Sequence, residues 1–153
     1  MAGRKFHKNR FNRSQSFLSS RVILVREKKL IEINYGFLNC HILNNKLICI
    51  GKTKPTPYSV EYEFKIVYDG IYSPRVFINS PEIIYNDEIH MFSNDMSLCL
   101  FHRETDNFYW NFRKHNLYDT IIPWALEWFI YYELYLISGK WEHPHIDHRL
   151  NYN

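Results

Sequence analysis

A strict alternation of apolar and polar residues over residues 58–66 is the feature that most limits what this chain can fold into. The segment is Tyr-Ser-Val-Glu-Tyr-Glu-Phe-Lys-Ile, so an extended backbone places all apolar side chains on one side and all polar ones on the other. A helix would scatter the same side chains around its axis. The alternation therefore predicts a half-buried antiparallel strand, and with it a sheet that has one face in the core.

Shorter segments indicate the partners of this strand. The other predicted strands lie at residues 37–42, 46–50 and 75–78. Leu43-Asn44-Asn45 lies between the first two, which predicts a hairpin. Residues 54–57 contain two prolines, which lack a backbone N–H and fix φ, so a loop is expected there. Asp69-Gly70 predicts the turn that follows the alternating strand.

A helix is expected before these strands, from about residues 12–16 to residue 33. Asn12 and Gln15 have the spacing of a capping box, which marks a helix start. Residues 22–25 are rich in β-branched side chains and leave a strand as the alternative. The residues predicted to form the apolar stripe are Phe17, Leu18, Val22, Val25 and Leu30.

A second helix is expected near the C-terminus. Asp119 or Thr120 would start it, and Pro123 is tolerated in a first helical turn. Gly139 is a natural residue for a helix end, because glycine adopts the left-handed conformation without steric cost. Residues 121–137 are nearly all apolar, but they are too few for a membrane span and include two glutamates. A buried core helix is predicted, and no membrane association.

Between the last strand and this helix, residues 79–118 show no periodicity. A long irregular stretch in a compact domain is usually functional or disordered. Its many apolar residues argue for an ordered loop: Phe92, Leu98, Phe101, Phe108, Trp110 and Phe112. The predicted order is therefore helix, four strands, ordered loop and helix, an α+β fold built on an antiparallel meander.

Composition and charge limit the class of protein. The chain has 153 residues, 46% of them hydrophobic and 18% aromatic, which excludes a disordered chain and predicts an aromatic-rich core. Residues 1–30 carry nine Lys or Arg against one Glu, and the rest is acidic. We expect a basic flexible arm over residues 1–13 and a single domain over 14–153. No aromatic–basic stacking pattern or Gly-rich segment accompanies the arm, so nucleic acid is an unlikely partner.

Cysteine usage bears on the compartment. Cys40, Cys49 and Cys99 form an odd set without paired short spacings, and residues 2–13 contain no apolar signal segment. Both features favour a reducing, cytoplasmic environment over a disulfide framework. Cys40 and Cys49 fall in strand-like segments and are expected in the core.

The predicted order of elements resembles that of ubiquitin-conjugating enzymes, and local residues resemble the family too. Tyr72-Ser73-Pro74-Arg75-Val76 is similar to the segment that leads into the fourth strand. His90 matches the His of the His-Pro-Asn tripeptide, and Ser97-Leu98-Cys99-Leu100 is similar to the segment around the nucleophile. Trp110 matches a Trp often found downstream of that cysteine.

The C-terminal half resembles a bacterial branch of this superfamily, encoded in operons for cyclic-oligonucleotide-based antiphage signalling (CBASS, short type II). The similar residues are Pro123-Trp124-Ala125-Leu126-Glu127-Trp128-Phe129, Tyr132-Glu133 and Gly139-Lys140-Trp141. The resemblance covers about residues 15–148. It implies that Cys99 carries a protein C-terminus as a thioester and passes it to a target lysine. The implied partners are a cGAS-like nucleotidyltransferase or a ubiquitin-like protein as the transferred protein, and an activating enzyme.

This chemistry needs an accessible thiolate and a donor for the oxyanion, but no metal or other cofactor. ATP would be consumed by a separate enzyme, since the chain has no phosphate-binding Gly-rich loop. Met91-Phe92 stand where the eukaryotic family has Pro-Asn, so we expect Ser93 or Asn94 to supply the oxyanion donor. His90 is expected to hold the loop through hydrogen bonds of its imidazole.

Residues of the C-terminal tail allow two further interpretations. His145 is a candidate proton carrier near Cys99. His143, His145 and His148 suggest zinc, but their spacing fits no common ligand pattern, so no metal is expected. Two alternatives of other classes stay open: a non-catalytic scaffold that binds a partner protein, and a nucleic-acid-binding module that uses the basic arm.

Overall fold

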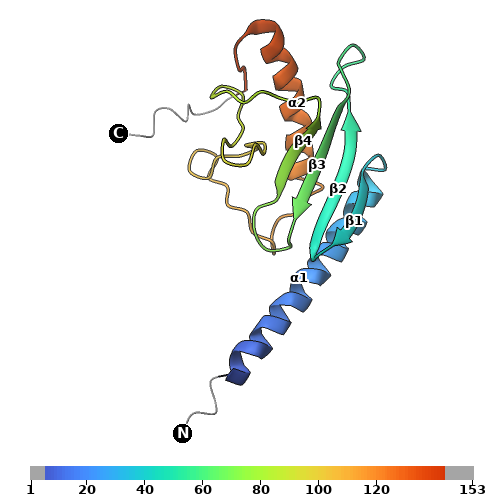
Figure 1. The fold of residues 1–153 in the computed structure, drawn as a ribbon, viewed down its shortest axis with the longest axis vertical. Helices are drawn as coiled ribbons and strands as arrows, with labels where there is room; N and C mark the ends of the chain where they lie inside the picture. The colour runs from blue at the N-terminus through green and yellow to red at the C-terminus, as the bar shows by residue number, and fades with distance from the viewer. Residues whose placement is uncertain (1–5, 144–153) are drawn as a thin grey trace.

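The computed structural model describes the backbone of residues 6–143 and the side chains from Ser19 onward. It has a helix at each end of the chain and four strands between them, as expected (Figure 1). The elements are α1 (Phe6–Asn34), β1 (Asn39–Leu43), β2 (Lys46–Thr53), β3 (Tyr62–Tyr68), β4 (Arg75–Ser80) and α2 (Ile121–Ser138). In the described part of the chain, no helix is long and apolar enough to cross a membrane.

The four strands form one antiparallel sheet in the order β1-β2-β3-β4. The β1–β2 hairpin closes through a two-residue turn, with Leu43 opposite Lys46. Asn44 and Asn45 both have positive φ, 49° and 58°, which is the geometry of the turn that best matches strand twist. Asparagine tolerates this conformation better than most residues, so the local sequence explains the predicted hairpin.

The strand predicted over residues 58–66 begins later, at Tyr62, and continues to Tyr68. The prediction was wrong for its first four residues, and Tyr58 is 97% exposed. The cause is the preceding turn: the Ser59 N–H donates to the Thr56 carbonyl, and the two hydroxyls hydrogen-bond at 2.8 Å. These bonds keep the chain in the turn beyond Pro57. The alternating residues therefore begin at Tyr58, whereas the strand begins only at Tyr62.

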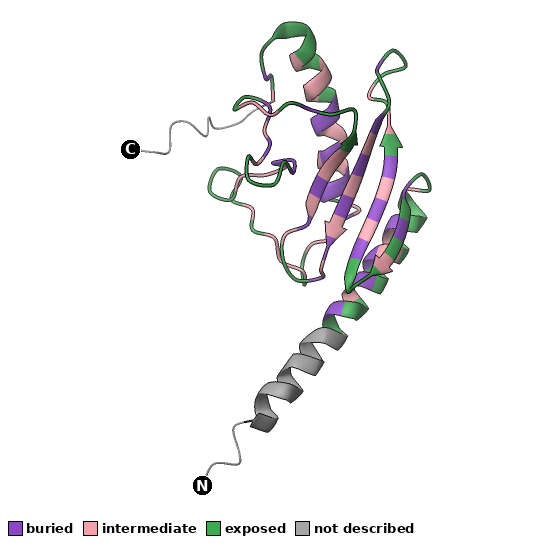
Figure 2. Ribbon diagram, viewed as in Figure 1, coloured by how far each residue is buried: buried purple, intermediate pink, exposed green. Residues whose placement is uncertain are grey.

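Both helices lie behind the sheet in Figure 1, on the face that carries the core. Alternate residues of β3, beginning at Tyr62 and ending at Tyr68, are buried, as the banded colouring of that strand shows (Figure 2). The ring centroid of Phe129 in α2 lies 4.9 Å from that of Tyr62 and 5.6 Å from that of Phe64. α1 packs against β1 and β2. One aromatic-rich core therefore joins the sheet to both helices.

α1 departs from its prediction at its start and in the face that it buries. It begins at Phe6 rather than at residues 12–16, because no glycine or proline interrupts the chain after Gly3. The expected stripe was out of phase, since Val22 is 69% exposed and Val25 is also exposed. The buried face is instead Ser20, Leu24, Glu27 and Ile31, at helical spacing.

A buried carboxylate fixes the phase of α1. Glu27 is fully buried, and its Oε2 accepts the Leu117 N–H at 2.9 Å. Burial raises the pKa of this carboxyl, against the hydrogen bonds from Leu117 and Arg26 that lower it. The contact links α1 to the chain just before α2, 90 residues away. α2 itself ends as predicted, with Gly139 at φ 72° and its N–H bonded to the Tyr135 carbonyl.

Candidate active site

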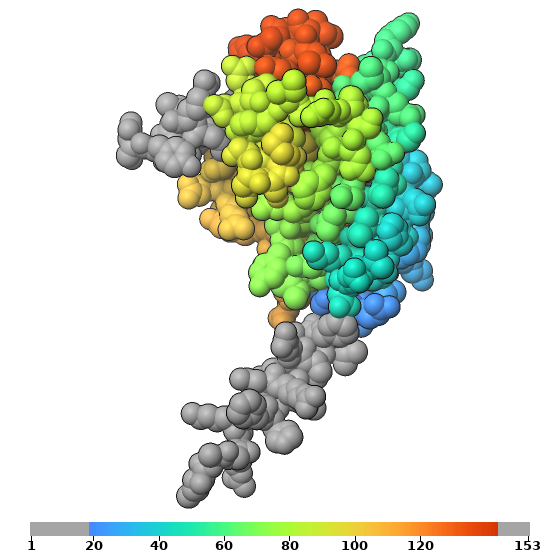
Figure 3. All heavy atoms as spheres, viewed as in Figure 1, coloured from blue at the N-terminus to red at the C-terminus, as the bar shows by residue number. Residues whose placement is uncertain are grey.

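The ordered loop between β4 and α2 builds the candidate site. In the space-filling view the chain that follows β4 (yellow-green to yellow) lies on the surface and borders the end of α2 (red) (Figure 3). Within it, Met91 and Leu98 form an isolated antiparallel bridge, and the Phe92 N–H donates to the Ser97 carbonyl at 2.8 Å. Residues 90–99 thus form a short irregular hairpin, with Ser93 and Asn94 at its tip.

Two backbone hydrogen bonds fix the position of Cys99. Its N–H donates to the His90 carbonyl at 2.8 Å, and the neighbouring Leu98 N–H donates to the Val76 carbonyl of β4, also at 2.8 Å. The first bond closes the hairpin, and the second attaches it to the edge of the sheet. Cys99 is therefore positioned by the sheet, although it lies in a loop.

His90 holds this hairpin through its backbone. Its carbonyl also accepts the indole N–H of Trp128 in α2 at 3.1 Å, and so does the Ile89 carbonyl at the same distance. The imidazole stacks on Trp141, with ring centroids 5.4 Å apart and planes 8° from parallel. His90 has a φ of 50°, a left-handed conformation that is uncommon outside glycine. The structure thus joins His90, Cys99 and α2 at one point.

The sulfur of Cys99 is largely enclosed. The residue exposes 6% of its surface, and its thiol donates to the Phe101 carbonyl at 3.7 Å. Burial and, to a smaller extent, the Asp106 carboxylate together raise the pKa of the thiol to about 11, against the Arg75 guanidinium, which lowers it. The thiol is thus mainly protonated near neutral pH.

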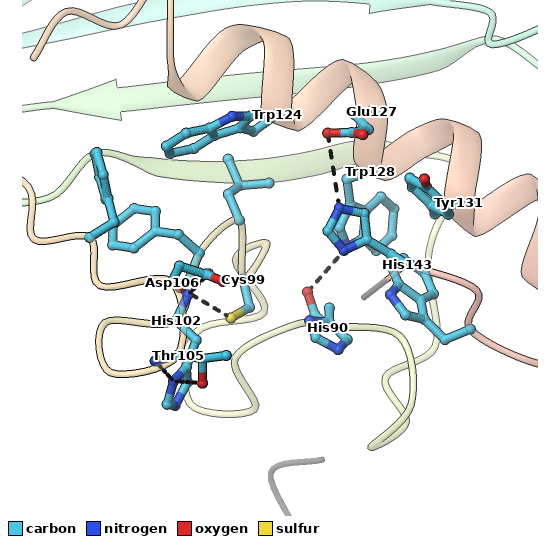
Figure 4. A pocket seen from close by; sticks show the side chains of 14 residues that line it. His90, Cys99, His102, Thr105, Asp106, Trp124, Glu127, Trp128, Tyr131 and His143 are labelled. Carbon is cyan, nitrogen blue, oxygen red and sulfur yellow. Dashed lines mark hydrogen bonds and ion pairs between the residues drawn. The ribbon is translucent and has the colours of Figure 1, made fainter. Parts of the chain in front are cut away.

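Cys99 lines two pockets. The first, of about 310 Å³, lies between the loop and α2. Figure 4 shows Trp124 and Glu127 on the α2 side and Cys99 with His102 on the loop side. Aromatic rings dominate its wall, and two carboxylates, Glu127 and Asp106, make it acidic.

The second pocket, of about 610 Å³, lies toward β4. Cys99 shares it with Arg75 and Phe92, and the Arg75 guanidinium lies over the Phe92 ring at 4.8 Å from its centroid. Arg103 and Glu104 complete its charged lining. The sulfur therefore lies in a wall common to an acidic aromatic pocket and a pocket that holds two arginines.

The predicted supporting residues fall in different places. Ser93 and Asn94 are exposed at the hairpin tip, and neither belongs to the residues that line the two pockets with Cys99. Their role as oxyanion donors stays a prediction. His145 lies outside the described residues. His143 is described, and its Nε2 is 4.0 Å from the Glu127 carboxylate in the first pocket.

The remaining aromatic and cysteine predictions concern packing. Trp110 is attached to the sheet, with its indole N–H donating to the Tyr68 hydroxyl at 3.3 Å. Trp128 is buried and Trp124 partly buried, and both line the first pocket. Cys40 and Cys49 are buried opposite each other on β1 and β2, as expected of core residues. Among the side chains that the structure describes, those of residues 19–143, no group of three or more His, Cys, Asp or Glu could hold a metal ion.

Five charged residues that line the two pockets with Cys99 were not predicted as site residues: Arg75, Arg103, Glu104, Asp106 and Glu127. Arg75 is 24 positions before Cys99 in the sequence, and only the pairing of the loop with β4 brings them into one pocket. The one feature of the sequence that could have pointed to Arg75 was its place after Pro74, at the start of a predicted strand. Asp106 carries no local pattern that separates it from other surface acids, and Glu127 lies in the Trp-rich segment of the resemblance, which gave it no role.

Comparison with known proteins identifies a family. A family model described as "Type II CBASS E2 protein" matches residues 27–149. The matched range contains the whole sheet, the cysteine hairpin and α2. A search of curated proteins finds no match.

Proposed function

The chain belongs to the type II CBASS E2 proteins, which have an E2-like (ubiquitin-conjugating-like) role in this antiphage defence, and we propose that it is a transferase with Cys99 as acyl carrier. The observation that carries the proposal is the position of Cys99, which the sheet holds in the common wall of two pockets. A carrier cysteine must meet a protein C-terminus and an amine in turn, and two pockets at one sulfur suit that requirement.

The first step loads Cys99. The thiol loses its proton to water, and the thiolate attacks the carbonyl carbon of an activated C-terminus, an acyl adenylate or thioester made by a separate ATP-dependent enzyme. A C–S bond forms, and the bond to the activating group breaks, so that this group leaves with the bonding electrons. The product is a thioester, which is far more reactive toward amines than an amide.

The second step discharges it. A lysine amine of the target attacks the thioester carbon, a C–N bond forms and the C–S bond breaks. Cys99 leaves as a thiolate, and the amine loses its proton to solvent. Family membership implies protein partners from the CBASS operon. We infer that the transferred protein is the cGAS-like nucleotidyltransferase, with a ubiquitin-like protein as the alternative.

A reductant-sensitive adduct tests the proposal. The tagged protein is purified after expression with its operon neighbours and run on gels with and without reductant. We expect an adduct on the natural chain that reductant removes. The same adduct should persist as an ester in Cys99→Ser and be absent from Cys99→Ala. Cys40→Ala is the matched control, because Cys40 is also buried but lies on β1. An adduct that depends on Cys40 instead would refute the proposal.

The enclosure of Cys99 favours a second candidate function. A sulfur in a residue that is 6% exposed, with its pKa raised to about 11, is also what a non-catalytic binding scaffold would contain. A scaffold would keep co-purifying with its partners and protecting cells from phage in the Cys99→Ala variant. A transferase keeps the binding and loses the protection, so the two functions are separated by one variant.

A further inference from the structure

The pocket toward β4 contains a cation that is attached to the cysteine hairpin. The Arg75 Nη1 donates to the Ser97 hydroxyl at 3.3 Å, and its Nε lies 3.7 Å from the Asp95 carboxylate. Ser97 is two residues before Cys99. The next residue on β4, Val76, accepts the Leu98 N–H. The guanidinium is therefore attached to the hairpin by Ser97 and Asp95, and the Leu98–Val76 bond attaches the same hairpin to the backbone of β4.

We propose that Arg75 is the electrostatic partner of Cys99 and stabilises the thiolate that forms before attack and on release. This inference rests on the proposed function and deepens it, because it assigns a role to Arg75, to which the sequence resemblance gave none. Negative charge is present on sulfur at the start of loading and at the end of discharge. A fixed positive charge in the same pocket lowers the free energy of both states relative to the neutral thiol.

The charged and titratable groups around Cys99 come from five segments. Titratable or charged groups that line its two pockets are Arg75 on β4, His90 in the hairpin, His102, Arg103, Glu104 and Asp106 in the loop, Glu127 on α2, and His143 after α2. Of these, Arg75 lowers and Asp106 raises the pKa of the thiol. Arg75 is the one of the two that favours a thiolate.

Arg75 is also restrained enough to act in this way. Its guanidinium lies over the Phe92 ring, and Asp95 in turn accepts the Ser97 hydroxyl. Partial burial raises the pKa of Asp95, but the hydrogen bonds from Ser97 and the charge of Arg75 lower it below its usual value overall. Asp95 thus stays ionised and offsets part of the Arg75 charge, which predicts that removing the Asp95 charge strengthens the effect of Arg75 on the sulfur.

The test is the rate at which iodoacetamide alkylates Cys99 between pH 7 and 11, followed by mass spectrometry of the Cys99 peptide. Arg75→Gln keeps a hydrogen-bond donor for Ser97 and removes the charge. We expect alkylation at pH 8 to fall about three- to tenfold, and the pH profile to shift upward. Arg75→Lys should restore the natural profile. Arg103→Gln, a charge loss in the same pocket, should stay within about twofold of the natural chain.

A second variant covers the case in which Arg75→Gln does not fold. Asp95→Asn should increase alkylation at pH 8 about two- to threefold, because it leaves the Arg75 charge less offset. An unchanged profile in Arg75→Gln, an equal slowing in Arg103→Gln, no recovery in Arg75→Lys, or no gain in Asp95→Asn would each overturn the inference. Alkylation needs no partner protein, so it is independent of whether Cys99 carries an acyl group. Thioester formation in Arg75→Gln, measured separately, tests the transfer itself.

Discussion

At the scale of single residues, the candidate site is a balance of burial and charge on one sulfur. The pKa of Cys99 is raised to about 11, mainly by enclosure. The charge of Asp106 also raises this pKa, and the charge of Arg75 lowers it. An enclosed cysteine is protected from adventitious chemistry, but it needs help to ionise. The residue that gives this help, Arg75, lies on β4, 24 positions before Cys99 in the sequence.

Asp106→Asn tests the unfavourable half of that balance. Removal of the negative charge lowers the pKa of Cys99, so we expect iodoacetamide alkylation at pH 8 to rise about two- to fivefold. The amide oxygen can still accept the His102 N–H that Asp106 accepts at 2.7 Å. Glu104→Gln is the control, since Glu104 also lines a pocket with Cys99, whereas Asp106 is the carboxylate that raises the pKa of the thiol. Slower alkylation in Asp106→Asn would contradict this sign.

Glu27→Gln tests the buried carboxylate under α1. Its pKa is raised in the folded state, so the folded protein holds the proton more tightly than the unfolded chain does. The natural chain should therefore lose stability relative to Glu27→Gln as the pH rises above about 4.5, the ordinary value, until the folded carboxyl is ionised. Urea unfolding from pH 4 to 8 measures the difference. A natural chain that gains stability relative to Glu27→Gln as the pH rises would show that ionised Glu27 is stabilising.

Glu27→Ala separates charge from hydrogen bonding at the same position. It removes the acceptor of the Leu117 N–H, a buried backbone donor. We expect a loss of about 1–3 kcal/mol in the free energy of unfolding at every pH, with the pH dependence reduced as in the glutamine variant. A loss confined to high pH would contradict this account.

At the scale of elements, the sequence predicted the turns and helix ends that depend on the residues within them. The Asn44-Asn45 turn and the Gly139 helix end follow from residues that adopt positive φ, and both were predictable. The start of β3 and the phase of α1 were not, because hydrogen bonds to Thr56 and Leu117 decide them. A pattern of apolar residues cannot show that a glutamate belongs in the core.

Gly70→Ala tests how closely α1 approaches the turn after β3. Gly70 has a φ of 84°, and a Cβ built on it would lie 2.9 Å from the Ser20 carbonyl oxygen of α1. Backbone strain and this contact should together cost about 1–3 kcal/mol in the free energy of unfolding. Gly36→Ala is the matched control, because a Cβ there meets nothing within 4 Å, and a change of at most about 0.5 kcal/mol is expected. Urea denaturation compares them, and equal losses would rule out the close approach as the cause.

At the scale of the whole molecule, the sheet separates two regions. α1 packs against β1 and β2, whereas the cysteine hairpin is attached to β4 at the other edge. A partner protein that binds α1 from its exposed side would thus leave both pockets of Cys99 open. The sequence predicted this order of elements, but not the backbone hydrogen bond from Cys99 to His90. It could not predict Arg75 as a neighbour of Cys99, because only the attachment of Leu98 to β4 brings these residues together.

The measurement that tests the central claim most directly is the location of the acyl bond. The Cys99→Ser protein, purified after expression with its operon neighbours, is digested and its cross-linked peptides are identified by mass spectrometry. We predict that the C-terminus of a partner protein is joined by an ester to the side chain at position 99, and that hydroxylamine releases it. A partner C-terminus joined at another residue, or an ester-free peptide 99 while the partner co-purifies, would contradict the assignment of Cys99 as the acyl carrier.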